Sequence, residues 1–459
     1  MVSCRNVIKG TTMTPTKPTV LFLTDSYLHH PSINGVCCEN VVHEGQKRGY
    51  SITVLADFLR NDDLLREEMN GVTVLRIKPS GLIRLVTRLK QKKGILAALL
   101  RKSLTLTHRI GNEMAWRFMS FFLRHEIEWY QSSAWSGVDF LFIMRLYRTL
   151  DRLYQKQHFD YLIVSHYPPD NLAAAAWLKK KYPQICYIPW MLDALAGGNW
   201  PHVKSSESGD FDVDYYDALC LKRERYFFKN ADRIFAMETS RNYHNNHCRE
   251  ADYYDRFRYM EPSLFTLPRS PKNGTLPVVF DRSKINILFA GYLYELRDPT
   301  SFFQTLDQHL FDNVVCWLCG GITAQNLKIV NFYEEKYPGH IHVLGNIPHE
   351  QLGALYQQAD FLLNVGEKNP NVIAGKIFEY MATGKPILST VPDGGNTATA
   401  YLQRYPAALL LPESEDVEKA AVRLEIFFNQ WRGKNLCFEE YADSFYESSP
   451  KAFWDALSK

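Results

Sequence analysis

The sequence has little of what would mark a membrane-spanning, secreted or nucleic-acid-binding protein. No apolar run reaches the ~18 residues of a transmembrane helix, and the polar, Thr- and Pro-rich start over 1–18 lacks the apolar core of a signal peptide. The nine cysteines are scattered and odd in number, which does not fit a disulfide framework and favours a reducing compartment. The formal net charge is only +3, far below that of a protein that coats nucleic acid. We therefore expect a cytoplasmic protein with no nucleic acid partner and a short disordered leader over 1–18.

What is present is the composition of a globular protein, with 46% hydrophobic and 22% charged residues among 459. Short apolar runs rich in β-branched residues alternate with segments of helical periodicity, which predicts an α/β fold of parallel sheets. The predicted strands fall into two sets, 20–24, 51–55, 161–164, 186–189 and 233–237 in the first half, and 285–290, 314–319, 341–344, 361–365 and 386–390 in the second. Ligands bind beyond the carboxyl ends of parallel strands, so we expect the site in a central cleft between two Rossmann-like domains.

The same pattern predicts where the domains begin and end. After the leader we expect an N-terminal Rossmann-like domain over 19–265 and a linker over 266–280, where prolines and a glycine interrupt regular structure. A C-terminal Rossmann-like domain follows over 281–430. Helices over 431–459 complete the chain and can cross back to the N-terminal domain. Within the first domain, residues 69–157 are expected to form a basic and aromatic helical insertion.

The most informative stretch lies between the last two predicted strands, from Asn369 to Pro386. We expect a helix that begins near Ala374, with free backbone N–H groups and a partial positive charge at its start. Gly375 leaves room for an anion there, and Lys376 adds a full positive charge. Glu379 is three residues onward, on the same helix face, where it can accept hydrogen bonds from sugar hydroxyls. The pair equally fits an exposed ion pair on a surface helix.

This stretch resembles the donor-site helix of GT-B glycosyltransferases, specifically retaining enzymes of the family 4 type. Every fixed position of the pattern N-x-x-x-G-K-x-F-E-Y-x-A-x-G-K-P is present. Further resembling segments occur in order, at 48–55, 231–234, 289–293 with Arg297, and 344–348 with Leu352, Tyr356, Ala359 and Asp360. The resemblance is specific over 280–390, weaker over 19–57 and 158–240, and absent over 58–157.

The resemblance implies a role for each matching residue. Glu379 would bind the ribose of a nucleotide-diphosphate sugar, and Lys376 and Arg297 would neutralise its diphosphate. His166 and Asp193, at strand ends of the N-terminal domain, would lie near the transferred sugar. Without the resemblance, His166 also fits a core histidine and Asp193 a helix cap. The donor-binding positions implied are Gly35, Gly291, Gly345, Asn346, Ile347, Asn371, Gly375, Lys376 and Glu379, and the catalytic ones His166, Asp193, Arg297 and Lys376.

Two positions depart from the family pattern. Members often have a second Glu eight residues before the ribose-binding one, where this chain has the neutral and shorter Asn371. Tyr292 stands where many members carry Arg, so one diphosphate charge is missing. Both departures keep open a non-catalytic GT-B module that binds only glycan or membrane. A nucleotide-sugar epimerase of the same fold is a further alternative.

The favoured interpretation is a glycosyltransferase that moves a sugar from a nucleotide-diphosphate donor to a glycan or lipid-linked acceptor, with retention of anomeric configuration. Departure of the nucleotide leaves negative charge on its phosphate, which preplaced cations stabilise. We expect Lys and Arg to replace a divalent ion, so no metal and no cofactor is predicted. His244, His247 and Cys248 lack a second ligand pair nearby, and we expect them at the surface.

The segment from Met69 to Asn112 has an unusual charge pattern. It contains ten Lys and Arg and no Asp or Glu, its leucines recur at helical spacing, and aromatic residues follow. This pattern suits a peripheral contact of residues 69–135 with an anionic membrane, such as the inner face of the plasma membrane. Alternatively, the apolar residues are domain core and the cations a solvated face.

Overall fold

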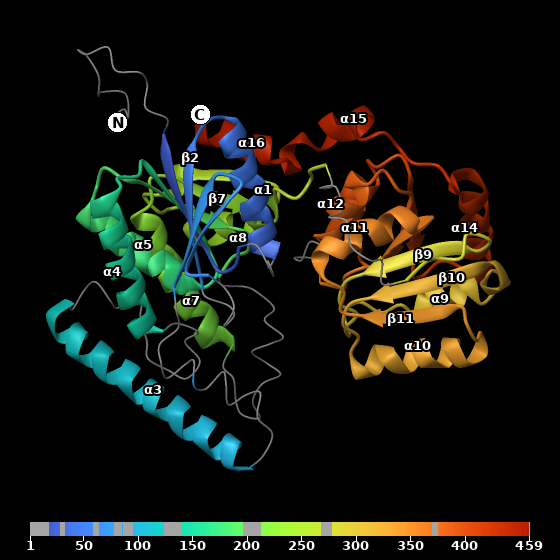
Figure 1. Ribbon diagram of the computed structural model, residues 1–459, viewed down its shortest axis with the longest axis horizontal. Coiled ribbons are helices and arrows are strands. Elements are labelled where there is room, and N and C mark those ends of the chain that lie inside the picture. Colours follow the sequence, from blue (N-terminus) through green and yellow to red (C-terminus); the bar gives the residue numbers. More distant parts are fainter. Residues whose placement is uncertain are drawn as a thin grey trace. The chain divides into compact units, whose positions relative to one another are not determined.

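The computed structural model describes residues 18–27, 33–57, 64–77, 85, 95–123, 139–195, 213–267, 278–369 and 375–458. The chain divides into two compact units, Met1–Met237 with Arg241–Tyr259, and Glu238–Ser240 with Met260–Lys459. Each unit is an α/β structure built around its own sheet (Figure 1).

The sheet of the first unit has eight strands in the order β3-β4-β2-β1-β5-β6-β7-β8. Neighbours from β4 through β7 pair in parallel, and β3 pairs antiparallel with β4. Most of these strands are nearly continuous runs of buried apolar residues, as expected of a parallel sheet covered on both faces. The strands are β1 Thr19–Thr24, β2 Ser51–Asp57, β3 Arg66–Met69, β4 Val72–Ile77, β5 Tyr161–Ser165, β6 Cys186–Met191, β7 Ile234–Met237 and β8 Phe257–Met260.

Helices cover both faces of this sheet, with α4 and α5 on one side and α1 on the other (Figure 1). The run Ala173–Ala176 in α5 is completely buried, because side chains this small let the helix pack closely on its neighbours. The helices are α1 Ile33–Lys47, α3 Ile95–Leu123, α4 Phe140–Lys156, α5 Pro169–Lys181, α7 Val213–Lys229 and α8 Arg241–Cys248.

The second unit has a six-stranded parallel sheet in the order β11-β10-β9-β12-β13-β14. Its strands are β9 Ile285–Ala290, β10 Val314–Cys319, β11 Ile341–Gly345, β12 Phe361–Asn364, β13 Ile387–Val391 and β14 Ala408–Pro412. Its helices are α9 Thr300–Leu306, α10 Ala324–Lys336, α11 His349–Gln358, α12 Lys376–Ala382, α13 Thr397–Leu402, α14 Val417–Trp431, α15 Phe438–Tyr441 and α16 Pro450–Ser458. A separate hydrophobic core, with α9 and α14 packed together, fills this unit.

In each sheet, the strands that follow the first strand along the chain are placed first on one side of it and later on the other. In the first unit, β2 is added on one side of β1 and β5 on the other; in the second, β10 is added on one side of β9 and β12 on the other. Loops that leave two such strands diverge and open a crevice beyond the carboxyl ends. The strand order therefore predicts that ligands bind beyond the carboxyl ends of β1 and β5, and beyond those of β9 and β12. We call these two positions the β1/β5 edge and the β9/β12 edge.

All ten predicted strands are confirmed, with boundaries within about two residues. The prediction of a helical insertion over 69–157 was wrong at both ends. Val72–Ile77 is strand β4, whose Val72 and Val74 are buried, and α4 belongs to the domain core through Phe140, Ile143, Leu146 and Leu150. Residues 1–17 of the predicted leader and 268–277 of the predicted linker lie outside the described residues.

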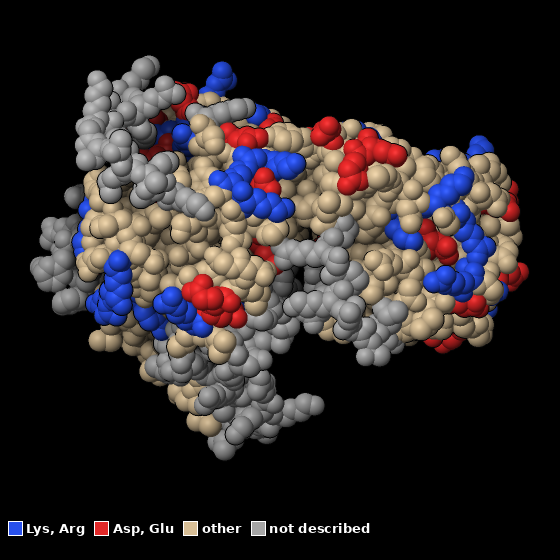
Figure 2. All heavy atoms as spheres, turned by 45° about the horizontal axis from the view of Figure 1, so that its top comes forward, with Lys and Arg blue, Asp and Glu red and all other residues tan. Residues whose placement is uncertain are grey.

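The surface carries both signs of charge. On the face shown in Figure 2, basic and acidic side chains lie near one another among larger uncharged areas, consistent with a net charge of only +3. Among the described residues, no helix combines the length and the apolarity needed to cross a membrane.

Candidate functional site

The strand-end turns of the second unit are held together by their backbones. The Gly291 N–H donates to the carbonyl of Cys319 (2.9 Å), and the Gly320 N–H donates to the carbonyl of Gly345 (2.7 Å). Gly320 has φ +120°, and a Cβ there would lie 1.8 Å from the Gly291 carbonyl oxygen. Only glycine fits this position. The predicted donor-site glycines Gly291 and Gly345 therefore flank a single turn at the carboxyl edge of the sheet.

The first turn of α12 carries the predicted cation and carboxylate. Gly375 caps the helix and Lys376 is its first residue; the predicted start near Ala374 lies outside the described residues. The Lys376 ammonium nitrogen is 2.9 and 2.8 Å from the two Glu379 carboxylate oxygens. Both side chains are partly exposed, 28% for Lys376 and 19% for Glu379. A ligand can therefore reach either group without unfolding the helix.

Tyr356 of α11 fixes the orientation of this carboxylate. Its hydroxyl donates to Glu379 Oε2 at 3.1 Å. Tyr356 is buried, and burial together with the charge of Glu379 raises its pKa well above the ordinary value, so the hydroxyl remains a hydrogen-bond donor. Sequence reasoning matched Tyr356 to the family pattern without assigning this contact.

Arg297 is held at the same edge by a buried carboxylate that sequence reasoning missed. The Arg297 Nε lies 3.0 Å from Glu367 Oε2, and Glu367 is only 2% exposed. The Tyr294 hydroxyl donates to the same oxygen, and the Asn369 N–H donates to Oε1 at 3.0 Å. Glu367 thus joins the loop after β9 to the loop after β12, the two loops that flank the reversal of the sheet. An acidic residue three positions beyond an apolar strand was the available signal.

Electrostatic effects connect these groups with the loop after β11. Burial raises the pKa of the Cys319 thiol, while a hydrogen bond from the Ile347 N–H and the charge of Lys376 act in the opposite direction. In α12, burial raises the pKa of Tyr380, and the charge of Arg297 opposes that shift. Ile347 and Lys376 therefore lie near Cys319, and Arg297 lies near Tyr380, all at the β9/β12 edge. Asn346 is exposed there, and Asn371 lies outside the described residues.

The remaining predicted residues lie at the corresponding edge of the first unit. His166 follows β5 and is 2% exposed; its Nδ1 accepts a hydrogen bond from the Leu192 N–H (3.3 Å), which places the ring proton on Nε2. The Nε2 is 3.9 Å from Asp193 Oδ2. Burial lowers the pKa of His166 to about 4, so the ring is a neutral donor at physiological pH. Gly35 is buried in the first turn of α1, after β1.

Several buried polar atoms surround this second edge without a hydrogen-bond partner among the described residues. They are Asn34 Oδ1 in α1, Ser165 Oγ at the end of β5, and both amide atoms of Asn171 in α5. An unsatisfied buried polar atom costs about 1–3 kcal/mol, so a ligand rich in hydroxyl groups would gain by binding there. Sequence reasoning did not identify these residues, which lie at the end of β5 and in the first turns of the helices that follow β1 and β5.

In the His/Cys cluster, His247 is exposed as predicted, but the expectation for the other two residues was wrong. His244 and Cys248 are buried, at 0% and 2% exposure, rather than at the surface. His244 packs among Phe228, Tyr243 and Phe257. Burial lowers its pKa to about 4, so it contributes a neutral aromatic ring to the core.

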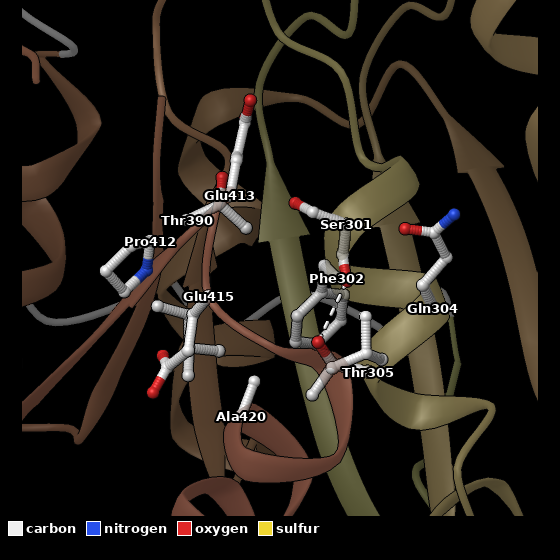
Figure 3. Close-up of a pocket in the computed structure, with 11 residues that line it drawn as sticks. Ser301, Phe302, Gln304, Thr305, Thr390, Pro412, Glu413, Glu415 and Ala420 are labelled. Atoms are coloured by element: carbon white, nitrogen blue, oxygen red, sulfur yellow. Dashed lines mark hydrogen bonds between the residues drawn. The ribbon is translucent and has the colours of Figure 1, made fainter. Parts of the chain in front are cut away.

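A small pocket lies between α9, the start of α14 and the carboxyl ends of β13 and β14 (Figure 3). Side chains from α9 and from the strand ends line it, among them Ser301, Thr390, Glu413 and Glu415. Its volume of about 20 Å³ is enough for about one water molecule. This pocket is too small for a sugar, and it borders the loop after β12, since Thr390 Oγ1 accepts a hydrogen bond from the Gly366 N–H (2.8 Å).

No protein family model matches the sequence, and no curated protein is similar to it in sequence. Solved structures are nevertheless similar along almost the whole chain. HepE from Anabaena, solved in complex with UDP and glucose, has a TM-score of 0.55 at 12% identity, covering 96% of this chain and 99% of that one. Sucrose-phosphate synthase from Thermosynechococcus elongatus has a TM-score of 0.53 at 12% identity, covering 91% of each chain.

WaaG, a glycosyltransferase involved in lipopolysaccharide biosynthesis, has a TM-score of 0.51 at 13% identity, with 95% of this chain and 98% of that one covered. The chain has the GT-B fold. The predicted fold class is thereby confirmed, including its two Rossmann-like sheets. Identities of 12–13% show a shared fold and leave the chemistry to the residues at the two edges.

Proposed function

We propose that the protein is a glycosyltransferase that takes a sugar from a nucleotide-diphosphate donor. The observation that carries the proposal is the arrangement of Lys376, Glu379 and Tyr356 at the β9/β12 edge of a GT-B fold. An ammonium group, an oriented carboxylate and a second cation, Arg297, are the groups that a ribose next to a diphosphate requires.

In the proposed complex, each group of the second unit has a distinct task. Glu379 accepts hydrogen bonds from the ribose hydroxyls while the Tyr356 hydroxyl holds its orientation. The Lys376 ammonium, which lies against Glu379 in this structure, turns toward the diphosphate. Arg297 supplies the second positive charge, held in place by Glu367. Gly345, Asn346 and Ile347 lie along the base.

Transfer follows from the separation of charge at the sugar carbon. When the bond between that carbon and the diphosphate breaks, negative charge develops on the phosphate and positive charge on the sugar, and Lys376 and Arg297 stabilise the former. The neutral His166 donates a hydrogen bond from Nε2 to the transferred sugar, and Asp193 and Gly35 belong to the same surface. The acceptor hydroxyl enters on the face that the nucleotide leaves, gives its proton to an oxygen of the departing diphosphate and bonds to the sugar carbon, with retention of configuration. The acceptor is a glycan or a lipid-linked acceptor.

The proposal includes catalysis without a metal ion, since Lys376 and Arg297 can balance the diphosphate charge. One feature of the sequence argues for testing this directly, because Asp210, Asp212 and Asp214 alternate in a way that can bind a divalent cation. Residues 210 and 212 lie outside the described residues. Turnover that survives EDTA would support metal independence, and turnover restored only by Mg²⁺ or Mn²⁺ would contradict it.

The experiment is a panel of UDP-, GDP- and other nucleotide sugars, starting with UDP-glucose because HepE was solved with UDP and glucose. Release of the nucleotide is measured with and without candidate acceptors. Glu379→Ala should abolish turnover of the accepted donor, whereas Glu425→Ala, an exposed carboxylate on α14, should not. Unchanged turnover by Glu379→Ala would refute the proposed site. Nucleotide binding with no turnover of any donor would instead assign a non-catalytic module.

A further inference from the structure

The long helix α3 presents an apolar stripe to solvent. Leu99, Leu106, Ile110 and Met114 are 60%, 58%, 51% and 65% exposed. Their spacings of seven, four and four residues place them on one helix face. A helix on the surface of a globular domain normally turns such a face toward the core, so this exposure requires an explanation.

The side of α3 that faces the domain carries polar contacts as well as Ala115, which packs against the hydrophobic core. His108 Nε2 lies 2.7 Å from Asp139 Oδ2, and Asn112 Oδ1 accepts a hydrogen bond from the Leu141 N–H (2.9 Å). Both contacts are made to the start of α4, beside which α3 lies at the edge of the first unit (Figure 1). Small and polar groups therefore hold α3 on the protein, while its large apolar side chains, Leu99, Leu106, Ile110 and Met114, face solvent.

Positive charge accompanies the stripe. Lys102 and Arg109 are exposed, and helical geometry places both on the same flank of the stripe. The single acidic residue of α3, Glu113, is paired with Arg117 at 2.6 Å. In sequence, the ten Lys and Arg between Met69 and Asn112 have no Asp or Glu among them.

We infer that the exposed face of α3 docks on an anionic lipid surface. An apolar stripe with cations beside it matches the acyl boundary and the charged headgroups of such a surface, with the helix lying in the plane of the interface. A second copy of the chain fits less well, because a symmetric contact through the stripe would gather the cations of both copies at one interface. The outer surface of a nucleic acid presents phosphates and no continuous apolar layer for the stripe. The inference goes beyond the proposed transferase activity and does not depend on it.

The test is sedimentation of the full-length protein with vesicles, without any nucleotide sugar. Vesicles of phosphatidylcholine alone are compared with vesicles of equal parts phosphatidylcholine and phosphatidylglycerol. We expect binding to the second kind only, weakened as ionic strength rises. Replacing both Leu106 and Ile110 by Glu should weaken it at least about tenfold, and replacing Lys102 by Glu about fivefold or more.

The matched control is Val422→Glu with Ile426→Glu on α14, two side chains of similar exposure, 52% and 60%, that are also four residues apart. This control should bind vesicles as the unchanged protein does. Circular dichroism shows whether each variant is folded, which is expected because every altered side chain is exposed. No binding to anionic vesicles, or equal binding by the α3 and α14 variants, would overturn the inference. Concentration-dependent dimerisation that only the α3 variant abolishes would also overturn it, in favour of a second copy.

Discussion

At the scale of single residues, the site depends on carboxylates that hold cations in place. Glu379 lies against Lys376, and Glu367 lies against Arg297. The two pairs differ in exposure, since Glu379 is partly exposed and Glu367 is buried. Glu379 can therefore exchange its cation for a ligand, whereas Glu367 serves as a positioning residue.

This distinction predicts the effect of Glu367→Gln. The substitution removes the negative charge that holds Arg297. It also replaces one carboxylate oxygen by an NH2 group, which cannot accept the hydrogen bonds that Glu367 accepts from its neighbours. The unfolding free energy should fall by about 1–3 kcal/mol. Donor turnover should fall at least about tenfold, because Arg297 would no longer be fixed beside the diphosphate. Steady-state kinetics and urea unfolding measure the two effects separately.

Glu415→Gln is the control, since Glu415 (Figure 3) is also paired with an arginine, Arg423 of α14 (2.5 Å). It should leave donor turnover unchanged. A Glu367→Gln protein that is folded and has full activity would show that Arg297 does not need this partner.

His166 predicts a specific pH dependence of stability. Its pKa is about 4 in the folded protein and about 6.5 in an unfolded chain. The unfolded state therefore binds more protons between these values, and the unfolding free energy decreases as the pH falls from 6.5 to 4. The decrease due to His166 reaches roughly 3 kcal/mol at the low end.

Urea unfolding of the unchanged protein and of His166→Gln at a series of pH values measures this contribution. The difference between the two unfolding free energies should shift by up to roughly 3 kcal/mol across that range. Other groups that titrate there, such as Asp170, are common to both proteins and cancel. A difference that does not change with pH would show that His166 is not held neutral by burial.

The sequence predicts contacts between residues of one helix better than contacts between distant segments. Lys376 and Glu379 were predicted as neighbours on one helix face, because their spacing fixes that relation, and the structure confirms it. Glu367 and Tyr356 were not assigned contacts, because their partners come from other loops and helices. The buried amide of Asn171 was missed because its burial depends on how α5 packs in the folded unit.

At the scale of elements, the turn after β10 has no room for any side chain at Gly320. Gly320→Ala would place a methyl group against the Gly291 carbonyl and force an alanine to φ +120°. We expect a loss of at least about 3 kcal/mol of unfolding free energy and weaker donor binding, because the Gly291 and Gly345 turns would shift.

Gly353→Ala is the matched control. Gly353 lies inside α11, and a Cβ there meets nothing within 4 Å. Its replacement should stabilise the protein by about 0.5–1 kcal/mol, since alanine favours helix. Thermal unfolding of both variants measures the contrast. Similar stability of the two variants would mean that the Gly320 turn can relax, contrary to its geometry.

Element prediction succeeded where a segment is uniformly apolar. β9 and β10 were predicted with their observed bounds, because buried parallel strands leave continuous apolar runs. Four strands were not predicted, namely β4 and the edge strands β3, β8 and β14. Three of the four residues of β3 are charged, and β4 lies at the start of the basic segment, so neither leaves a continuous apolar run. The apolar leucines of α3 were predicted to be helical, but no periodicity states which face of a helix meets the protein.

At the scale of the whole molecule, the fold class followed from the alternation of strands and helices, which two parallel sheets confirm. Strand order was not predictable, because each sheet reverses beside its first strand through contacts between distant segments. That order defines the β9/β12 edge, where we propose that Glu379 and Arg297 bind the nucleotide.

The most direct measurement of the central claim is calorimetric titration of UDP and GDP into the full-length protein. We expect one of the two nucleotides to bind, with affinity unchanged in Glu425→Gln and at least about tenfold weaker in Glu379→Gln, since a charged hydrogen bond to the ribose is lost. Equal affinity of the unchanged protein and Glu379→Gln, or no binding of either nucleotide, would contradict the account.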